Sequence, residues 1–595
     1  MNDLAKTGIW LKRVLDRHWL RLTLIAWAIL LLWFMVDRWN MIRWLSLGDT
    51  DDNMRLSQVR ALLNGQGWYD LRQYRLSPPA GFDIHWSRIV DLPLAGLILL
   101  LRPFVGEAEA ERLACGIAPL LPLSIALLGL AATVRRLISP IAWPLAIVLL
   151  LCCATTMSMF MPDRIDHHGW QLAMLSLTVA GLADPQQRRG GLVVGLSSAV
   201  SLNIGLELLP YAGMAGAIIT LRWVWTRDET ARLAVYGLTL AGGSGIGFVL
   251  FASNANQVLR CDALTPVWLS VMVVGGGFLF LLARLNPAER WVRLTLALVA
   301  AAIIGTGFAL LFPQCLGRPE QVSPELARTW LNNVREARPI YKHPLRMAFP
   351  IVALPVIGLI GACLATWAAR RRPSITGWVP VLMFSTFAGL MLLWQARAGP
   401  AAQLLAVPGM VALAWIGLPW LVRHRGIGVR VAGVIVVLAA LGVLFSGSMM
   451  KYLSIDRPSK RVQVVNRATG LCMTVPALKP LDRFPKQVIF TFVDLGPRLI
   501  TVTHHDAIAG PYHRNGDAIL DVQHAFSRSP ENFRATAKKY GATLLLVCPN
   551  MSESTVYRAR NPGGFYDQLA HKKVPTWLTP VLLPKKSPFR LFKIS

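Results

Sequence analysis

The sequence predicts a polytopic α-helical membrane protein of about 13 transmembrane helices with a small α/β domain at its C-terminal end. Of the 595 residues, 54% are apolar and 16% are charged, against roughly 45–50% and roughly 25% in soluble domains. The apolar residues also form long uncharged runs, such as Leu294–Leu311, which approach the roughly 20 residues that cross a membrane. These observations exclude a soluble globular protein, a disordered chain and a fibrous chain.

Hydrophobic segments along the chain define the predicted spans. The first follows a basic N-terminus and lacks a small-residue cleavage site, so we interpret it as an uncleaved span and not as a signal peptide. An odd number of spans places the two termini on opposite sides of the membrane. The predicted spans are 20–37, 112–134, 140–158, 170–183, 191–204, 207–224, 233–252, 265–283, 294–312, 347–368, 376–395, 400–422 and 429–448.

Arginines mark one side of this topology. Every loop that follows an even-numbered span is basic, as cytoplasmic loops are, so the net charge of +29 does not indicate nucleic-acid binding. We expect a cytoplasmic N-terminus and, in a bacterial inner membrane, a transmembrane domain over 1–448 with a periplasmic α/β domain over 449–595. The outer loops of interest are 38–111, 159–169 and 313–346.

The C-terminal segment combines predicted strands with an amphipathic stretch, Ala518–Lys539, that predicts one or two helices. Its excess of Lys and Arg suits anionic lipid headgroups or a phosphate-bearing substrate, or is an ordinary basic surface beside a membrane. The β-branched and apolar runs are Gln487–Val493, Leu499–Thr503, Thr543–Val547 and Phe589–Ile594.

Four cysteines fall on the predicted outer side. They can form two disulfides in an oxidising compartment, or they are unpaired buried thiols. The pairs that the topology allows are Cys261–Cys315 and Cys472–Cys548.

Two polar clusters on the outer side are candidates for chemistry. Gly48–Arg55 holds three acids in four positions. These acids bind a hard divalent cation, or they cap the helix predicted over 54–63. Pro162–Gly169 contains an Asp-His-His run, and these residue types bind transition metals or act as acid and base.

Two further clusters lie on the same side. The loop 313–346 carries Glu320, Glu325 and Glu336. Arg397 stands at the outer end of a predicted span, where it can snorkel to lipid phosphate or bind a substrate phosphate. The sequence has no P-loop, dinucleotide fingerprint, serine elbow or thiolate zinc pattern. Nucleotide-driven chemistry is therefore not expected, and a donor at this face would be anchored in the membrane.

The first cluster belongs to a longer pattern. Asp49–Arg55, followed by Pro79–Trp86 and Asp91, resembles the first outer loop of the oligosaccharyltransferase catalytic subunit. The archaeal members of that family carry a Pro-x-Gly-x-x-Ile-His-Trp segment. The family also has thirteen spans and an outer C-terminal domain, and it belongs to the GT-C class of glycosyltransferases.

Three shorter motifs extend the resemblance over roughly residues 20–420. Asp166–His168 is similar to the family motif that supplies metal ligands. Val334–Pro339 is similar to its Val-x-Glu-x-x-Pro segment, and Gln395–Arg397 to the arginine that holds the lipid-linked phosphate.

The resemblance implies a role for each motif. Asp49, Asp166 and His168 would bind a divalent cation, Mg or Mn, and Asp49 would also contact the acceptor. Glu336 would act on the acceptor, and Arg397 would hold the phosphate of the leaving group. A cation and an arginine would stabilise the charge that develops when a polyprenyl phosphate leaves an anomeric carbon. Nearby acids that could substitute are Asp51, Asp52 and Asp163.

The implied function is a metal-dependent glycosyltransferase. It would move a sugar or oligosaccharide from a polyprenyl-phosphate or -pyrophosphate donor to a glycan, glycolipid or protein acceptor at the outer face of the membrane. The family's Trp-Trp-Asp-Tyr-Gly motif, which reads an acceptor peptide, is absent from 449–595, so we favour a glycan or glycolipid acceptor. Thr503–Asp506 and Gly510–Asn515 shape a different acceptor pocket or are ordinary turns.

Two other functions predict different features. A transporter or flippase of lipid-linked glycans would place charges near the middle of its spans, whereas the acids here cluster in outer loops. A non-catalytic assembly protein would tolerate Asn in place of Asp49 and Asp166.

Overall fold

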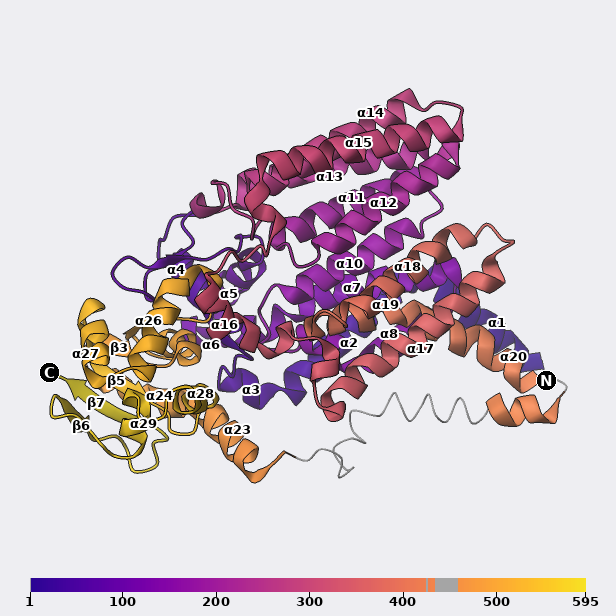
Figure 1. Ribbon diagram of the computed structural model, residues 1–595. Helices are drawn as coiled ribbons and strands as arrows, with labels where there is room; N and C mark the ends of the chain where they lie inside the picture. The colour runs from indigo at the N-terminus through magenta and orange to yellow at the C-terminus, as the bar shows by residue number, and fades with distance from the viewer. Residues whose placement is uncertain (1, 424–425, 434–457) are drawn as a thin grey trace.

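The computed structural model describes residues 2–423, 426–433 and 458–595. Long helices lie side by side in a bundle, and the elements after residue 458 gather at one end of it, so the two chain termini lie at opposite ends of the molecule (Figure 1). The helices of the bundle and its N-terminal extension are α1 Asn2–Arg17, α2 Trp19–Asp37, α6 Glu107–Ile117, α7 Leu120–Leu137, α8 Trp143–Leu151, α9 Ala154–Met157, α10 His168–Leu182, α11 Gln187–Ile204, α12 Leu209–Trp225, α13 Thr230–Phe251, α14 Pro266–Leu285, α15 Arg290–Leu311, α17 Leu345–Ala369, α18 Ile375–Met391, α19 Gly399–Ala412 and α20 Leu418–Arg423.

The chain is a multi-pass membrane protein, as predicted. In the described residues, seven helices are long and apolar enough to cross a membrane, or up to eight if a bent pair is one span. Others are shorter than the roughly 20 residues of a full span, such as α10 with 15 residues and α12 with 17. The count of 13 is therefore not confirmed, and the last predicted span, 429–448, lies largely outside the described residues, as does the predicted boundary at 448/449.

The predicted span 140–158 is broken in the structure. Its two halves, Trp143–Leu151 and Ala154–Phe160, meet at an angle of 81°. The backbone N–H of Thr155, freed by the break, donates to Oε1 of the buried Gln403 over 3.0 Å. A membrane interior tolerates a helix break where neighbouring side chains satisfy the freed backbone groups. Here α19 supplies that partner.

Short elements cover the end of the bundle that faces the C-terminal domain. The helix expected over 54–63 begins four residues earlier, because Asp49 is its N-cap. Cys261 and Cys315 form a disulfide that ties the segment before α14 to the start of the loop 313–346. The elements here are α3 Trp39–Arg43, α4 Thr50–Leu63, β1 Arg72–Gln73, β2 Phe82–Asp83, α5 Asp91–Val105, α16 Pro324–Thr329 and the 3₁₀ turns η4 Pro313–Leu316, η5 Leu331–Asn333, η6 Arg335–Ala337 and η7 Ile340–Lys342.

The C-terminal region is an α/β unit around a five-stranded sheet of order β4-β3-β5-β7-β6. β3 is parallel to β4 and β5, and β7 is antiparallel to β5 and β6. Cys472 and Cys548 form the second disulfide. The elements are α23 Lys460–Cys472, α24 Val475–Leu478, η10 Lys479–Arg483, β3 Val488–Phe490, α25 Gly496–Val502, β4 Asp506–Ala507, α26 Gly516–Ser527, α27 Pro530–Lys539, β5 Ala542–Val547, α28 Ser552–Arg560, α29 Phe565–Ala570, β6 Leu578–Val581 and β7 Arg590–Ile594.

One predicted strand of this unit is a helix. The β-branched run Leu499–Thr503 lies mostly in α25, which packs against α4. Thr501 Oγ1 donates to the Asn53 carbonyl over 3.0 Å, and Arg498 donates to Asn53 Oδ1 over 3.1 Å. Packing against α4 therefore overrides the local β preference. It also holds the C-terminal unit against the helix that Asp49 caps.

Candidate functional site

The site begins at the N-terminus of α4. Asp49 Oδ1 accepts hydrogen bonds from the backbone N–H groups of Asp51, at 2.9 Å, and Asp52, at 3.3 Å. Asp52 Oδ2 accepts in return from the backbone N–H of Asp49 over 3.0 Å. This reciprocal capping box fixes both carboxylates at the start of the helix. The helix-cap interpretation of the first cluster is therefore confirmed, and the second oxygen of Asp49 faces the guanidinium of Arg164.

The second cluster, 114 residues further along, meets this helix end. The backbone N–H of Asp166 donates to Asp52 Oδ1 over 3.0 Å. Arg164 Nη1 donates to Asp52 Oδ2 over 3.0 Å and also forms an ion pair with Asp49 Oδ2. Arg164 Nη2 lies 3.7 Å from Asp166 Oδ2. The fold thus brings the two predicted clusters together, and Arg164 lies between their acids.

Asp166 and His168 fit a metal ion. Asp166 Oδ2 lies 3.3 Å from His168 Nε2, close to the separation of about 3 Å expected for two neighbouring ligands of one octahedral cation. Among the described residues, this buried oxygen has no hydrogen-bond partner. Arg164 and His168 lie near this oxygen without a hydrogen bond to it. A buried carboxylate oxygen that accepts no hydrogen bond is costly, and a bound cation would supply a direct interaction. Asp49, the third predicted ligand, is joined to this pair through Arg164.

Acidic side chains outnumber basic ones here. Burial raises the pKa of Asp51 well above its usual range, and the carboxylates of Asp166 and Asp49 raise it further. Burial opposes the charged form of His167, but Asp166 and Glu207 outweigh it and raise the pKa of His167 to about 10. Burial alone would likewise raise the pKa of Asp166, yet His167 and His168 lower it. The cluster holds crowded carboxylates that a divalent cation would stabilise.

Glu207 belongs to this cluster and was not predicted. His167 Nε2 donates to Glu207 Oε1 over 3.0 Å, and Gln171 Nε2 donates to Glu207 Oε2 over 2.7 Å. The sequence feature that could have identified Glu207 is its position, because it is an acid at the first residue of the predicted span 207–224. Arg164 was also overlooked, although it lies within the run Pro162–Gly169.

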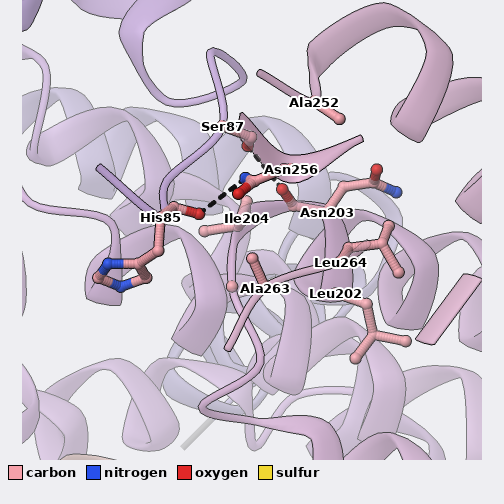
Figure 2. A pocket seen from close by; sticks show the side chains of 10 residues that line it. His85, Ser87, Leu202, Asn203, Ile204, Ala252, Asn256, Ala263 and Leu264 are labelled. Carbon is pink, nitrogen blue, oxygen red and sulfur yellow. Dashed lines mark hydrogen bonds between the residues drawn. The ribbon is translucent and has the colours of Figure 1, made fainter. Parts of the chain in front are cut away.

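A small cavity lies close to the cluster but is too narrow for a sugar. Its volume is about 10 Å³, near the minimum that holds a single water. Figure 2 shows His85, Asn203 and Asn256 around it. The amide of Asn256 donates to the His85 carbonyl over 3.0 Å, and Ser87 Oγ donates to the Asn203 carbonyl over 2.6 Å. These bonds anchor the first outer loop to the bundle.

Glu336 and Arg397 lie in neighbouring segments. Glu336 is in η6 and Arg397 is in η8, Ala396–Ala398, and the two turns are in contact. The Ala396 N–H donates to the Arg338 carbonyl over 2.8 Å. Both side chains are exposed, and within the part of the chain that is described no hydrogen bond or ion pair links either one to Asp166. The structure therefore places these two predicted residues on neighbouring turns, and in the described residues it gives them no hydrogen bond or ion pair to the acidic cluster.

The segment Gly510–Asn515 joins the C-terminal unit to the loop 38–111 and to the segment before α14. Tyr512 Oη donates to the Thr50 carbonyl over 2.8 Å, next to Asp49. Arg514 and His513 both bind Asp262 Oδ2, at 2.7 and 2.6 Å. Beside it lies a cavity of about 280 Å³, lined by residues that include Ser77, Arg514, Asn515, Lys539 and Tyr540.

Comparison with solved structures establishes the fold. The archaeal oligosaccharyltransferase AglB from Archaeoglobus fulgidus, in complex with an inhibitory peptide and a dolichol-phosphate, has a TM-score of 0.66 and 14% identity, over 97% of this chain and 74% of that one. The same enzyme tethered to an acceptor peptide with an NVT sequon gives 0.67 and 15%, over 98% and 75%.

A third structure of that enzyme, in complex with Zn and sulfate, gives a TM-score of 0.59 and 14% identity, over 91% of this chain and 69% of that one. The sequence matches no protein-family model and no curated protein. The predicted resemblance is thereby confirmed at the level of the fold: this chain has the GT-C architecture.

Proposed function

We propose that this protein is a metal-dependent glycosyltransferase of the outer face of a bacterial inner membrane. Its donor is a sugar or oligosaccharide on a polyprenyl phosphate or pyrophosphate, and its acceptor is a glycan, glycolipid or protein, with a glycan or glycolipid favoured. The observation that carries the proposal is the facing pair Asp166 and His168 among the acids at the start of α4, with a buried Asp166 oxygen that accepts no hydrogen bond from the described residues. This pair lies on a fold shared with an enzyme whose solved complex contains dolichol-phosphate.

We assign metal binding to Asp166 and His168, with Asp49 as the third ligand. Mg²⁺ or Mn²⁺ bound there would neutralise the charge that develops on the departing phosphate. His167 holds Asp166 in place, since its ring and its backbone N–H both contact Asp166 Oδ1, at 2.5 and 2.6 Å. Glu207 in turn orients the His167 ring. Such supporting hydrogen bonds fix metal ligands in their binding geometry.

The remaining roles fall to the two exposed residues of the loops. Arg397 presents a guanidinium at the outer end of α19, and its planar fork suits a phosphate. Glu336, in the turn packed beside it, would take the proton of the acceptor. Both side chains are free to engage a substrate, because no described residue binds either of them by a side-chain hydrogen bond or ion pair.

The observed positions of the acids favour an enzyme over a transporter of lipid-linked glycans. Asp49, Asp52 and Asp166 lie at helix starts and in loops next to the C-terminal unit. A transporter would instead carry its ionisable groups near the bilayer midplane.

The test is a lipid analysis of cells that lack the gene and carry wild type, Asp49→Ala, Asp166→Ala or an empty plasmid. Polyprenyl-linked glycans are quantified by mass spectrometry, with Glu320→Gln in the loop 313–346 as the matched control. We expect the donor to accumulate in the deletion and in both Asp variants at normal protein levels, and not in Glu320→Gln. Variants that match wild type while the deletion differs would contradict the metal site and favour the transporter.

A further inference from the structure

The C-terminal unit holds a second group of metal-ligating side chains, apart from the acidic cluster. Asp482 lies in η10, and His504 and His505 follow α25, more than 20 residues later in the chain. One oxygen or nitrogen of each side chain lies within 4.8 Å of the others. The fold therefore brings together two imidazoles and a carboxylate from two separate segments of the chain.

Backbone carbonyls orient both imidazole rings. His504 Nε2 donates to the Phe484 carbonyl, and His505 Nε2 donates to the Leu481 carbonyl, each over 2.9 Å. A neutral ring that donates through Nε2 keeps its lone pair on Nδ1. A ring nitrogen that donates to a carbonyl while the other is available is the usual arrangement of a metal-binding histidine. Each ring thus has an Nδ1 lone pair that can bind a metal.

The two Nδ1 atoms have different surroundings. His505 is fully buried, and its Nδ1 has no hydrogen-bond partner among the described residues. His504 Nδ1 lies 3.2 Å from Asp482 Oδ1. A buried ring nitrogen without a hydrogen-bond partner, such as His505 Nδ1, destabilises the fold. A metal ion bound to it would remove this destabilisation. His504 is 42% exposed, which gives an ion a path from solvent.

One neighbouring cation would compete for the carboxylate. Lys479 Nζ lies 2.7 Å from Asp482 Oδ2. Asp482 Oδ1 faces His504 Nδ1 and also accepts a hydrogen bond from the His504 backbone N–H over 3.2 Å, which leaves one of its lone pairs for a metal. The Lys479 side chain is 66% exposed, so it can turn into solvent without loss of packing. The carboxylate can therefore serve as a ligand.

We propose that Asp482, His504 and His505 form a binding site for a transition metal of the zinc class. Imidazole nitrogens suit Zn²⁺, whereas Mg²⁺ and Mn²⁺ prefer sites of carboxylate, carbonyl and water oxygens. Two imidazoles and one carboxylate leave a fourth position for water. The site thus differs in chemistry from the acidic cluster beside α4, and it does not depend on the function proposed above.

The position of this site indicates a structural role. Arg75 of the first outer loop donates to the carbonyls of Thr503, at 2.8 Å, and His505, at 2.6 Å. Leu76 pairs with Ala507 at the edge strand β4. A metal that joins η10 to residues 504–505 would therefore fix the turn that holds the first outer loop against the C-terminal unit.

The test measures zinc binding by the full-length protein in detergent. The protein is stripped with a chelator and equilibrated with micromolar Zn²⁺; bound zinc is then measured by mass spectrometry, and the Tm is recorded with and without zinc. The variants are His504→Ala and Asp482→Asn, because His505 is buried and its replacement could prevent folding. The matched controls are the exposed His571→Ala and Asp166→Asn, which removes a ligand of the acidic cluster.

We expect His504→Ala and Asp482→Asn to bind zinc at least roughly 10-fold more weakly than wild type and to lose the zinc-dependent rise in Tm. His571→Ala should match wild type, and Asp166→Asn should keep this zinc and its rise in Tm. With Co²⁺ as the probe, the spectrum of imidazole ligands should disappear with His504. Equal zinc in wild type, His504→Ala and Asp482→Asn would overturn the assignment, as would a wild type that binds none.

Discussion

Arg164 Nη1 donates a hydrogen bond to the buried carboxylate of Asp52 over 3.0 Å, and it thereby brings a positive charge into the acidic cluster. The same guanidinium pairs with Asp49. The guanidinium of Arg164 is therefore a positive charge that the protein itself places at the start of α4.

This arrangement predicts that Arg164→Gln makes the stability of the protein depend on a divalent metal. A buried carboxylate that loses the cation paired with it costs about 3–5 kcal/mol, and Mn²⁺ would restore part of that loss. We expect Mn²⁺ to raise the Tm of Arg164→Gln more than that of wild type or of the exposed Arg318→Gln, compared with EDTA. Equal shifts in all three proteins would contradict the role given to Arg164.

His168 offers a test of the metal site by conservative replacement. His168→Ala removes one ligand and should weaken Mn²⁺ binding by roughly 10–100-fold. His168→Asp restores a carboxylate ligand, which Mn²⁺ accepts, and should recover most of the binding. Electron paramagnetic resonance of bound Mn²⁺ measures both. If His168→Asp binds no better than His168→Ala, position 168 does not ligate the metal.

Glu336→Gln tests whether the loop 313–346 takes part in the reaction. Glu336 is exposed and forms no side-chain hydrogen bond or ion pair with the described residues, so its replacement should leave the Tm unchanged. Loss of a general base should lower glycosyl transfer by roughly 10²–10⁴-fold, measured as accumulation of the lipid-linked donor. Glu320→Gln serves as the control from the same loop. Normal transfer by Glu336→Gln would exclude this role.

Asp163 predicts a pH-dependent stability. Burial raises the pKa of its carboxyl group from 3.8 to about 6, so the folded state keeps a proton that the unfolded chain has already lost. The favourable contribution of the protonated group is complete below about pH 4 and is lost as the pH rises through about 6. Asp163→Asn stays neutral, and asparagine tolerates the positive φ of 69° at this position.

We therefore expect Asp163→Asn to be more stable than wild type above pH 6, by up to about 3 kcal/mol, and equal to it near pH 4. Tm measurements in detergent between pH 4 and 8 check this, with the exposed Asp228→Asn as the control. A difference that stays constant over this pH range would show that Asp163 does not titrate as described.

The class of the protein and the identity of its polar clusters can be predicted from composition and short motifs. Long apolar runs require a membrane, because water cannot accommodate them, and acids such as Asp49 and Asp166 stand out in a chain of so few charges. The resemblance of their motifs to one family predicted the fold that the comparison establishes. These features are local, so they can be read from neighbouring residues.

The tertiary structure decided which distant residues meet. No local pattern shows that Arg164 lies between Asp52 and Asp166 or that Glu207 supports His167. For the outer cysteines the sequence left two alternatives, the pairs 261–315 and 472–548 or unpaired thiols, and the structure contains both disulfides. The run Leu499–Thr503 has a β preference, yet its contact with α4 stabilises a helix. Such contacts join residues tens to hundreds of positions apart, and their free energy depends on burial and geometry that arise only when the whole chain packs.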